Sequence, residues 1–108
     1  MSSREVSSDD IGEEFERELA RVVERLRTMP LTRLATCSDT VFELCGKFAD
    51  LAHARGSGLP GASSVPRLGD HALPDQVRVL GMELAATADP STLSQAYALL
   101  VDMRKALP

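Results

Sequence analysis

The chain has no tryptophan and no asparagine, it has a single isoleucine, and its aromatic residues are three Phe and one Tyr among 108 residues. A core made mostly of Leu, Ala and Val suits close-packed helices, whereas strands favour β-branched and aromatic side chains. With 44% apolar and 26% charged residues, the composition is that of an ordinary globular protein. We therefore expect an all-α fold around a single hydrophobic core, which a chain of this length can build without disulfides or metals.

The chain also lacks a surplus of positive charge, a secretory signal and a long hydrophobic run. Its formal net charge of −4 argues against general binding to nucleic acid or to an anionic membrane surface, because both need a positive patch. The first ten residues have no apolar core, and the longest apolar run, Ala96 to Val101, is far shorter than a membrane span. Cys37 and Cys45 occupy apolar positions of one predicted helix, which is typical of reduced thiols in a cytoplasmic protein.

Residues 1–8 are polar and unpatterned, so we expect a disordered tail followed by one helical domain over residues 9–108. Asp10 and Glu13 match a capping box, which predicts the start of a first helix. The apolar seam of this helix steps by three or four residues through Ile11, Phe15, Leu19, Val22, Leu26 and Met29. Pro30 then ends the helix, because a proline disfavours helical geometry in the residue before it.

The stretch from Leu31 to Arg55 predicts one continuous helix at the centre of the fold. Its apolar residues form two adjacent rows, one of Leu34, Cys37, Val41, Leu44, Phe48 and Leu51, the other of Leu31, Ala35, Phe42, Cys45, Ala49 and Ala52. Because two rows make a stripe too wide for one partner helix, we expect this helix to be the most buried. The short connection at Pro30 favours an antiparallel hairpin with the first helix, and Gly56 is placed to cap the end of the second.

Residues 56–73 contain four Gly and two Pro and predict a long loop. Three of its residues are apolar and are expected to pin it to the core: Val65, Leu68 and Leu73. A third helix is predicted from Pro74 to about Ala88. It carries one apolar face of Val77, Leu80, Leu84 and Ala88 and another of Val79, Met82 and Ala86. A helix that is apolar on two sides is either sandwiched within its domain or buried by a second subunit.

Asp89 and Pro90 predict the N-cap and first residue of a fourth helix. The seam of this helix is Leu93, Ala96, Leu100, Met103 and Leu107. The sequence as a whole therefore predicts a four-helix, mainly antiparallel bundle, with a disordered N-terminal tail and a long Gly/Pro loop between the second and third helices.

Two histidines and a glycine-rich segment are the candidates for a binding site. Residues 56–61 match the dinucleotide-binding pattern G-x-G-x-x-G, but that pattern works between a strand and a helix, and no strand is predicted. His53 and Arg55 close the second predicted helix, and His71 lies in the loop. Asp50 and His53 have the spacing of one half of a metal-carboxylate bundle motif, whose other half is missing, so we expect no metal.

Residues 51–57 resemble the phosphorylatable-histidine segment of the histidine-phosphotransfer bundles, in which a basic residue, Gly and Ser follow the histidine. The resemblance would make His53 a phosphate carrier. That family, however, places the basic residue three positions after the histidine and continues the helix. Here Arg55 follows at two positions and Gly56 ends the predicted helix, so the chain is not assigned to the family.

Arg17, Arg21 and Arg25 follow one another at four-residue steps and form a basic ridge on the first helix. Their acidic neighbours are Glu14, Glu18 and Glu24. We interpret the ridge as a solvated, salt-bridged face, because exposed faces of mixed charge are the norm. The other interpretation is a contact with an acidic protein partner.

No Ser-His-Asp, Walker or zinc-knuckle pattern occurs, so we predict no enzyme, no catalytic residue and no cofactor. The apolar surplus of the last three helices predicts a non-enzymatic protein–protein interaction module that binds itself as a homodimer or binds another protein. The alternative is a small ligand-binding or phosphotransfer-like helical domain that uses the 56–73 loop and His53. The candidate binding residues are His53, Arg55, His71, Arg17, Arg21 and Arg25. Exchange of the first helix between subunits at the Pro30 turn also stays open.

Overall fold

The computed structural model describes residues 8–54 and 65–108, with side-chain detail from Ile11 to His53 and from Val65 onward. These residues form five α-helices and one 3-10 turn, and they contain no strand, so the predicted all-α class is confirmed. The elements are α1 (Ser8–Thr28), α2 (Leu31–Leu34), α3 (Ser38–Ala54), η2 (Asp70–Ala72), α4 (Leu73–Thr87) and α5 (Pro90–Ala106). Residues 1–7 of the predicted tail (residues 1–8) and the proposed C-cap at Gly56 lie outside the described residues, whereas Ser8, also expected in the tail, is the first residue of α1.

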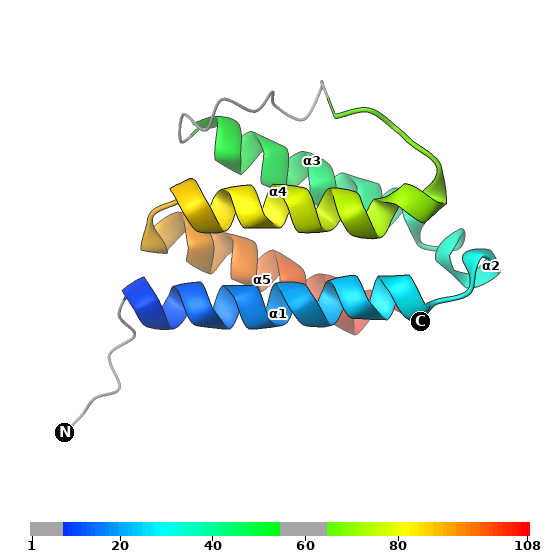
Figure 1. Ribbon diagram of the computed structural model, residues 1–108, viewed down its shortest axis with the longest axis horizontal. Coiled ribbons are helices and arrows are strands. Elements are labelled where there is room, and N and C mark those ends of the chain that lie inside the picture. The colour runs from blue at the N-terminus through cyan, green and yellow to red at the C-terminus, as the bar shows by residue number, and fades with distance from the viewer. Residues whose placement is uncertain (1–7, 55–64) are drawn as a thin grey trace.

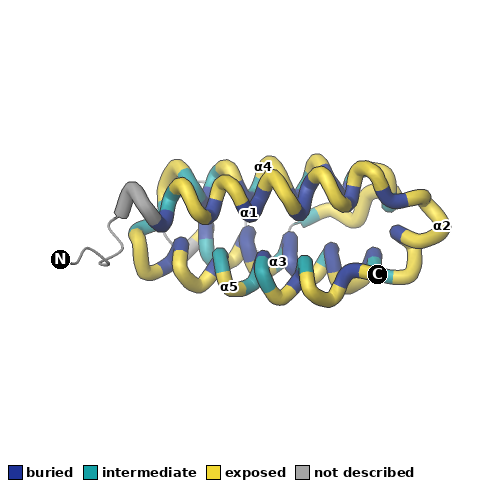
Figure 2. The backbone as a smooth tube through the Cα atoms, turned by 90° about the horizontal axis from the view of Figure 1, so that it is seen from below, coloured by how far each residue is buried: buried dark blue, intermediate teal, exposed yellow. Residues whose placement is uncertain are grey.

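The four long helices lie in two layers, with α1 and α4 in front and α3 and α5 behind (Figure 1). The dark blue, buried positions of each helix face the middle of the molecule (Figure 2). Helix α1 packs closely against both α4 and α5, and α4 packs closely against both α1 and α3. Helix α3 packs closely against α4 and more loosely against α5. The prediction that residues 31–55 form the central helix is therefore wrong, because α1 and α4 each have two close helix neighbours and α3 has one. Within this segment α3 is nevertheless well buried, and its fully buried residues are Val41, Cys45, Phe48, Ala49 and Ala52.

The helix directions correct the expectation of a mainly antiparallel bundle. Helices α1 and α5 run in the same direction. Arg104 on α5 donates to Glu18 on α1, and further along both segments Arg25 of α1 donates to the carbonyl of Pro108, just after α5. Helices α3 and α4 also run the same way, whereas α1 and α4 run in opposite directions (Figure 1). Helices α3 and α4 follow one another in the chain and are parallel, so their connection has to return along the bundle. The long segment between Ala54 and Leu73 makes this connection in the sequence.

The predicted hairpin of the first two long helices is also not formed. Helix α1 has α4 and α5 as its close neighbours, and α3 lies diagonally across the core from it. Phe15 of α1 and Phe48 of α3 reach across this diagonal, with ring centroids 6.0 Å apart and planes tilted by 51°. Such a tilted pair is favourable for aromatic rings, and both side chains are fully buried. Short connections favour neighbouring helices, but here the α2 turn separates α1 from α3.

The continuous helix predicted over residues 31–55 is broken at residues 35–37, between α2 and α3. The amides of Thr36 and Cys37 bond to carbonyls three residues back, both at 3.0 Å, which tightens the turn. The Thr36 hydroxyl also donates to the Arg33 carbonyl at 2.6 Å, and the Ser38 hydroxyl donates to the Ala35 carbonyl at 3.3 Å. Side chains that bond locally in this way compete with the regular helix ladder, which explains the break.

The break removes the first residues of the predicted second row from the core. Leu31 is 60% exposed, and Ala35 is exposed as well. The later members Cys45, Ala49 and Ala52 are fully buried. The predicted double row therefore holds only within α3.

The helix ends predicted from proline and aspartate agree with the structure. Helix α1 ends at Thr28, just before Pro30, although it begins at Ser8, two residues before the predicted capping box. The Asp89 side chain accepts a hydrogen bond from the Thr92 amide at 2.8 Å, and α5 begins at Pro90. Of the three residues expected to pin the long loop, Leu73 is buried and Val65 packs on the core, but Leu68 is 48% exposed.

Candidate functional site

The outer face of α4 is apolar and bare. Val77 and Leu84 point into the core and are fully buried, whereas Val79 and Met82 are 55% and 46% exposed. Ala86 continues this outer face and is exposed too. The second apolar face predicted for this helix is therefore present, and no other part of the described chain covers it.

A groove separates α1 from α4 on the same side of the molecule. Its apolar floor consists of Leu19, Ala20, Val23 and Met82, and its charged lining residues are Glu16, Glu24, Arg27 and Arg78. The two helices approach closely here, at Gly81, which has no side chain. A Cβ atom added to Gly81 would lie only 2.6 and 2.7 Å from the two Cδ atoms of Leu19. Arg27 also pairs with Asp75 of α4 at 3.0 Å across the end of the groove.

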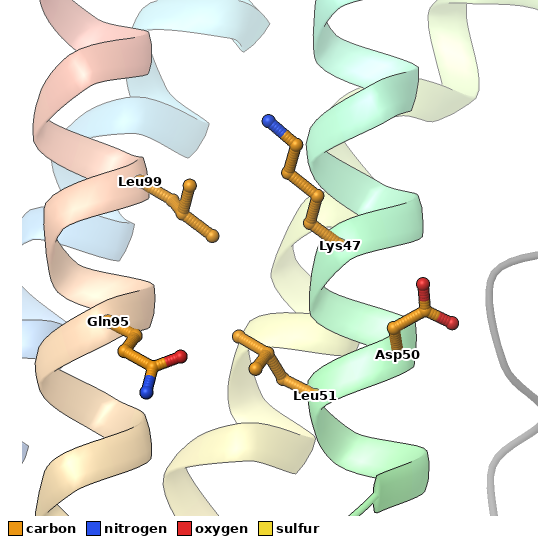
Figure 3. Close-up of a pocket in the computed structure, with 5 residues that line it drawn as sticks. All are labelled: Lys47, Asp50, Leu51, Gln95 and Leu99. Carbon is orange, nitrogen blue, oxygen red and sulfur yellow. The ribbon is translucent and has the colours of Figure 1, made fainter.

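A second groove lies between α3 and α5, where the packing is looser (Figure 3). Leu51 from α3 and Leu99 from α5 point into the gap from opposite sides, and the Gln95 amide lies beside Leu51 (Figure 3). Lys47 and Asp50 stand at its edge on α3, and the Asp50 carboxylate turns away from α5 (Figure 3). This groove is open and mainly apolar, so it offers surface for packing and few groups that do chemistry.

The arginine ridge of α1 is tied to neighbouring groups. Arg17 pairs with Glu14 at 3.3 Å, and Arg21 pairs with Glu18 at 3.3 Å. Arg25 donates to the Pro108 carbonyl. These contacts agree with the predicted salt-bridged face. Each arginine binds a different partner, so in these contacts the three side chains do not converge on one anion site.

Sequence reasoning missed the burial of Glu18, whose side chain is only 2% exposed and accepts from Arg104 of α5 as well as from Arg21. A helical projection contains the signal: Glu18 lies between Phe15 and Val22 on the core side of α1. A buried carboxylate requires a charged partner, so Arg104 is its structural counterpart. The pair joins α1 to α5, and neither residue lines either of the two grooves described above.

The two histidines lie at opposite ends of the bundle, His53 at the end of α3 and His71 in η2 (Figure 1). Both are exposed. They cannot share a ligand in this arrangement.

Three other predicted features lie outside the described residues: Arg55, the part of the phosphotransfer-like segment beyond Ala54, and the G-x-G-x-x-G segment. Within the residues that are described, no three His, Cys, Asp or Glu side chains gather closely enough to hold a metal ion.

Both cysteines are free thiols, Cys45 buried and Cys37 half-buried. Burial raises the pKa of the Cys45 thiol to about 11. Burial also raises the pKa of Cys37, partly offset by a backbone hydrogen bond, with a further increase from the charge of Asp70. Thiols with raised pKa values are poor nucleophiles at neutral pH, so neither cysteine has the environment of a reactive one.

Comparison with protein-family models, with curated proteins and with solved structures finds no significant match for this chain. Among the helices that the structure describes, none combines the length and apolar character needed to cross a bilayer. A functional interpretation of the chain therefore depends on its surfaces, of which the outer face of α4 and the adjoining α1–α4 groove are the most distinctive.

Proposed function

We propose that this protein is a non-enzymatic helical interaction module that acts as a homodimer. The observation that carries the proposal is the bare apolar face of α4, where Val79 and Met82 are about half exposed on a helix whose opposite face fills the core. Contiguous exposed apolar surface on a small protein marks an interaction site. Removing such side chains from water contributes roughly 1.5–3 kcal/mol for each one that becomes fully buried.

A second copy of the chain is the simplest partner, because closed two-fold dimers are the commonest assemblies of soluble proteins. In such a dimer each apolar residue of the interface counts twice, since both copies contribute it. Leu31 and Leu68, both largely exposed, add to the apolar surface that each copy can offer. The two free thiols are compatible with the cytoplasmic location that the sequence predicts.

The proposal is tested by native mass spectrometry of the untagged protein over a dilution series from about 50 μM to below 1 μM. We expect a dimer mass that gives way to monomer on dilution, with no small adduct. Monomer alone at the highest concentration contradicts the proposal. A monomer that carries a reproducible adduct, lost in His53→Gln without loss of the fold, would instead favour the ligand-binding or phosphotransfer-like alternative.

A further inference from the structure

The joint between α2 and α3 interrupts a segment that has the sequence pattern of one continuous helix. Both apolar rows of the sequence run through the joint, and neither Gly nor Pro occurs from Leu31 to Cys45. The two strongest helix breakers are therefore absent where the helix breaks. A 3-10 stretch inside such a segment is typical of a hinge or of a sequence under strain.

The backbone at this joint departs only slightly from a regular helix. The Ala35 amide donates to the Leu31 carbonyl at 2.9 Å, and the Val41 amide donates to the Cys37 carbonyl at 3.0 Å, both with the spacing of an α-helix. Between these two bonds, the amides of Thr36 and Cys37 reach carbonyls only three residues back. Ala35 itself has helical torsion angles, φ −59° and ψ −28°. Small changes in torsion angle at these residues therefore join α2 to α3 as one helix.

The helices against which α1 packs all come after this joint in the chain. Its close neighbours are α4 and α5. Leu19 lies against Gly81 of α4, and Glu18 accepts from Arg104 of α5. These contacts depend on where α1 lies relative to the later helices, and an α1 from another copy of the chain makes them equally well.

A straight joint carries α1 away from its own bundle. Leu31 is seven residues before Ser38, so in one continuous helix it lies roughly 10 Å beyond the start of α3, at about 1.5 Å per residue. Helix α1 is joined to α2 only through Met29 and Pro30. It therefore cannot keep its present register against its own α4 and α5 when the joint is straight.

We propose that residues 35–37 are a hinge that straightens in the homodimer, so that α1 of each chain packs on α4 and α5 of the other chain. The inference rests on the proposed homodimer and adds how its two chains are joined. A second copy is the occupant that fits the vacated face, because its α1 carries the same Glu18 and Leu19. Exchange of an identical helix needs no new complementary surface, since the contacts of α1 form again between the chains.

The first test divides a charge pair between two chains. Glu18→Arg in one chain and Arg104→Glu in another each place like charges at the α1–α5 contact. A mixed dimer with exchanged α1 helices has one pair of reversed sign and one wild-type pair, whereas without exchange both chains keep their repulsion. After the two variants are refolded together from urea, native mass spectrometry should show the mixed dimer in about tenfold excess over either variant dimer.

The control for this test is an ion pair that stays within each chain. Asp39 of α3 and Arg67 pair at 2.9 Å, and both residues come after the hinge. Asp39→Arg and Arg67→Glu, refolded together, should therefore give the random proportion of mixed dimer, about half.

A second pair of variants tests the exchange at the α1–α4 contact and places no charge in the core. Gly81→Ala adds a methyl group where Leu19 lies, and Leu19→Ala makes room for it. In a mixed dimer with exchanged helices, the added methyl group meets the shortened side chain, and the other contact is wild type. The mixed dimer should again predominate. This pair decides the test if the charge variants do not fold, alone or together.

The position of the hinge is tested at Thr36, whose hydroxyl donates to the Arg33 carbonyl within the turn. Thr36→Ala removes this bond from both hinges of a dimer and should lower the dissociation constant about tenfold, measured by sedimentation equilibrium. Thr40→Ala is the matched control, because Thr40 is equally an exposed threonine but lies within the regular part of α3. Equal dissociation constants of the two variants would overturn the assignment of the hinge to residues 35–37.

The outcomes separate the exchange from the homodimer itself. If the wild type dimerises but both pairs of variants combine at random, α1 is not exchanged, while the homodimer proposal stands. If the wild type is a monomer at every concentration, both proposals fail. A preference for the mixed dimer in either pair, with a random result for Asp39→Arg and Arg67→Glu, supports the exchange.

Discussion

Glu18 of α1 and Arg104 of α5 form an ion pair in which the Glu18 side chain is almost completely buried and the Arg104 side chain is 40% exposed. The residues are 86 positions apart in the sequence. Arg21, one turn along α1, is the second partner of the same carboxylate. The pair therefore fixes the parallel contact of two helices near opposite ends of the chain.

Arg104→Met should lower the free energy of unfolding by about 2–3 kcal/mol, because it leaves a buried carboxylate with one partner instead of two. Urea denaturation measures the change. Arg17→Met, which breaks only the exposed pair with Glu14, should change stability by no more than about 0.5 kcal/mol. Equal effects of the two variants would show that burial of Glu18 does not matter for stability.

Gly81→Ala should destabilise the protein by roughly 1–2 kcal/mol, although alanine is the better helix former by about 1 kcal/mol. The new Cβ would meet both Cδ atoms of the buried Leu19 and force α1 and α4 apart. Gly12→Ala is the control, because a Cβ on Gly12 meets nothing within 4 Å. Gly12→Ala should therefore raise the midpoint of thermal unfolding, and Gly81→Ala should lower it. A rise in both would mean that Leu19 can move away without cost.

Asp89→Ala should cost about 1 kcal/mol, because it removes the side-chain acceptor of the Thr92 amide at the start of α5. Chemical denaturation measures the loss, and Asp89→Asn should retain most of the stability, since an amide oxygen also caps a helix. Ser91→Ala, an exposed change in the same turn, serves as the control. No difference between Asp89→Ala and Ser91→Ala would rule out a capping contribution.

Stability should fall as the pH rises from about 9 towards 11, in part because of Cys45. The pKa of its thiol is raised from 9.0 to about 11 in the folded chain, so between these values the unfolded chain loses the proton first. The contribution is fully present below pH 9 and is lost as the pH passes the folded pKa. Cys45→Ala should flatten this part of the curve of unfolding free energy against pH. An unchanged slope would assign the whole decline to other groups.

The sequence predicts the parts of this fold that depend on neighbouring residues. Pro30 ends α1, Asp89 caps α5, and the apolar seams of both helices lie in the core, since each depends on spacing within one segment. The bare face of α4 was predictable for the same reason, as Val79 and Met82 stand opposite Val77 and Leu84 on the helix.

The sequence does not predict which helices become neighbours. Seams of similar width fit an antiparallel hairpin as well as the observed parallel pairs, because periodicity carries no information about direction. The break after Leu34 depends on hydroxyls that bond to the backbone, and serine and threonine also occur within regular helices. The burial of Glu18 was missed because a buried carboxylate needs a charged partner. That partner, Arg104, is 86 residues further along the chain and cannot be identified from the sequence around Glu18.

The parallel contact between α1 and α5 has a consequence for folding during synthesis. Helix α1 leaves the ribosome before α5, and one side of its apolar seam has no cover until α5 has been made. The separation in sequence is 86 residues for Glu18 and Arg104. Contacts of such long range form late and slow the folding of a small domain. Until α5 has been made, the nascent chain therefore exposes the side of α1 that α5 covers in the folded protein, and transiently exposed apolar surface of this kind is prone to aggregation.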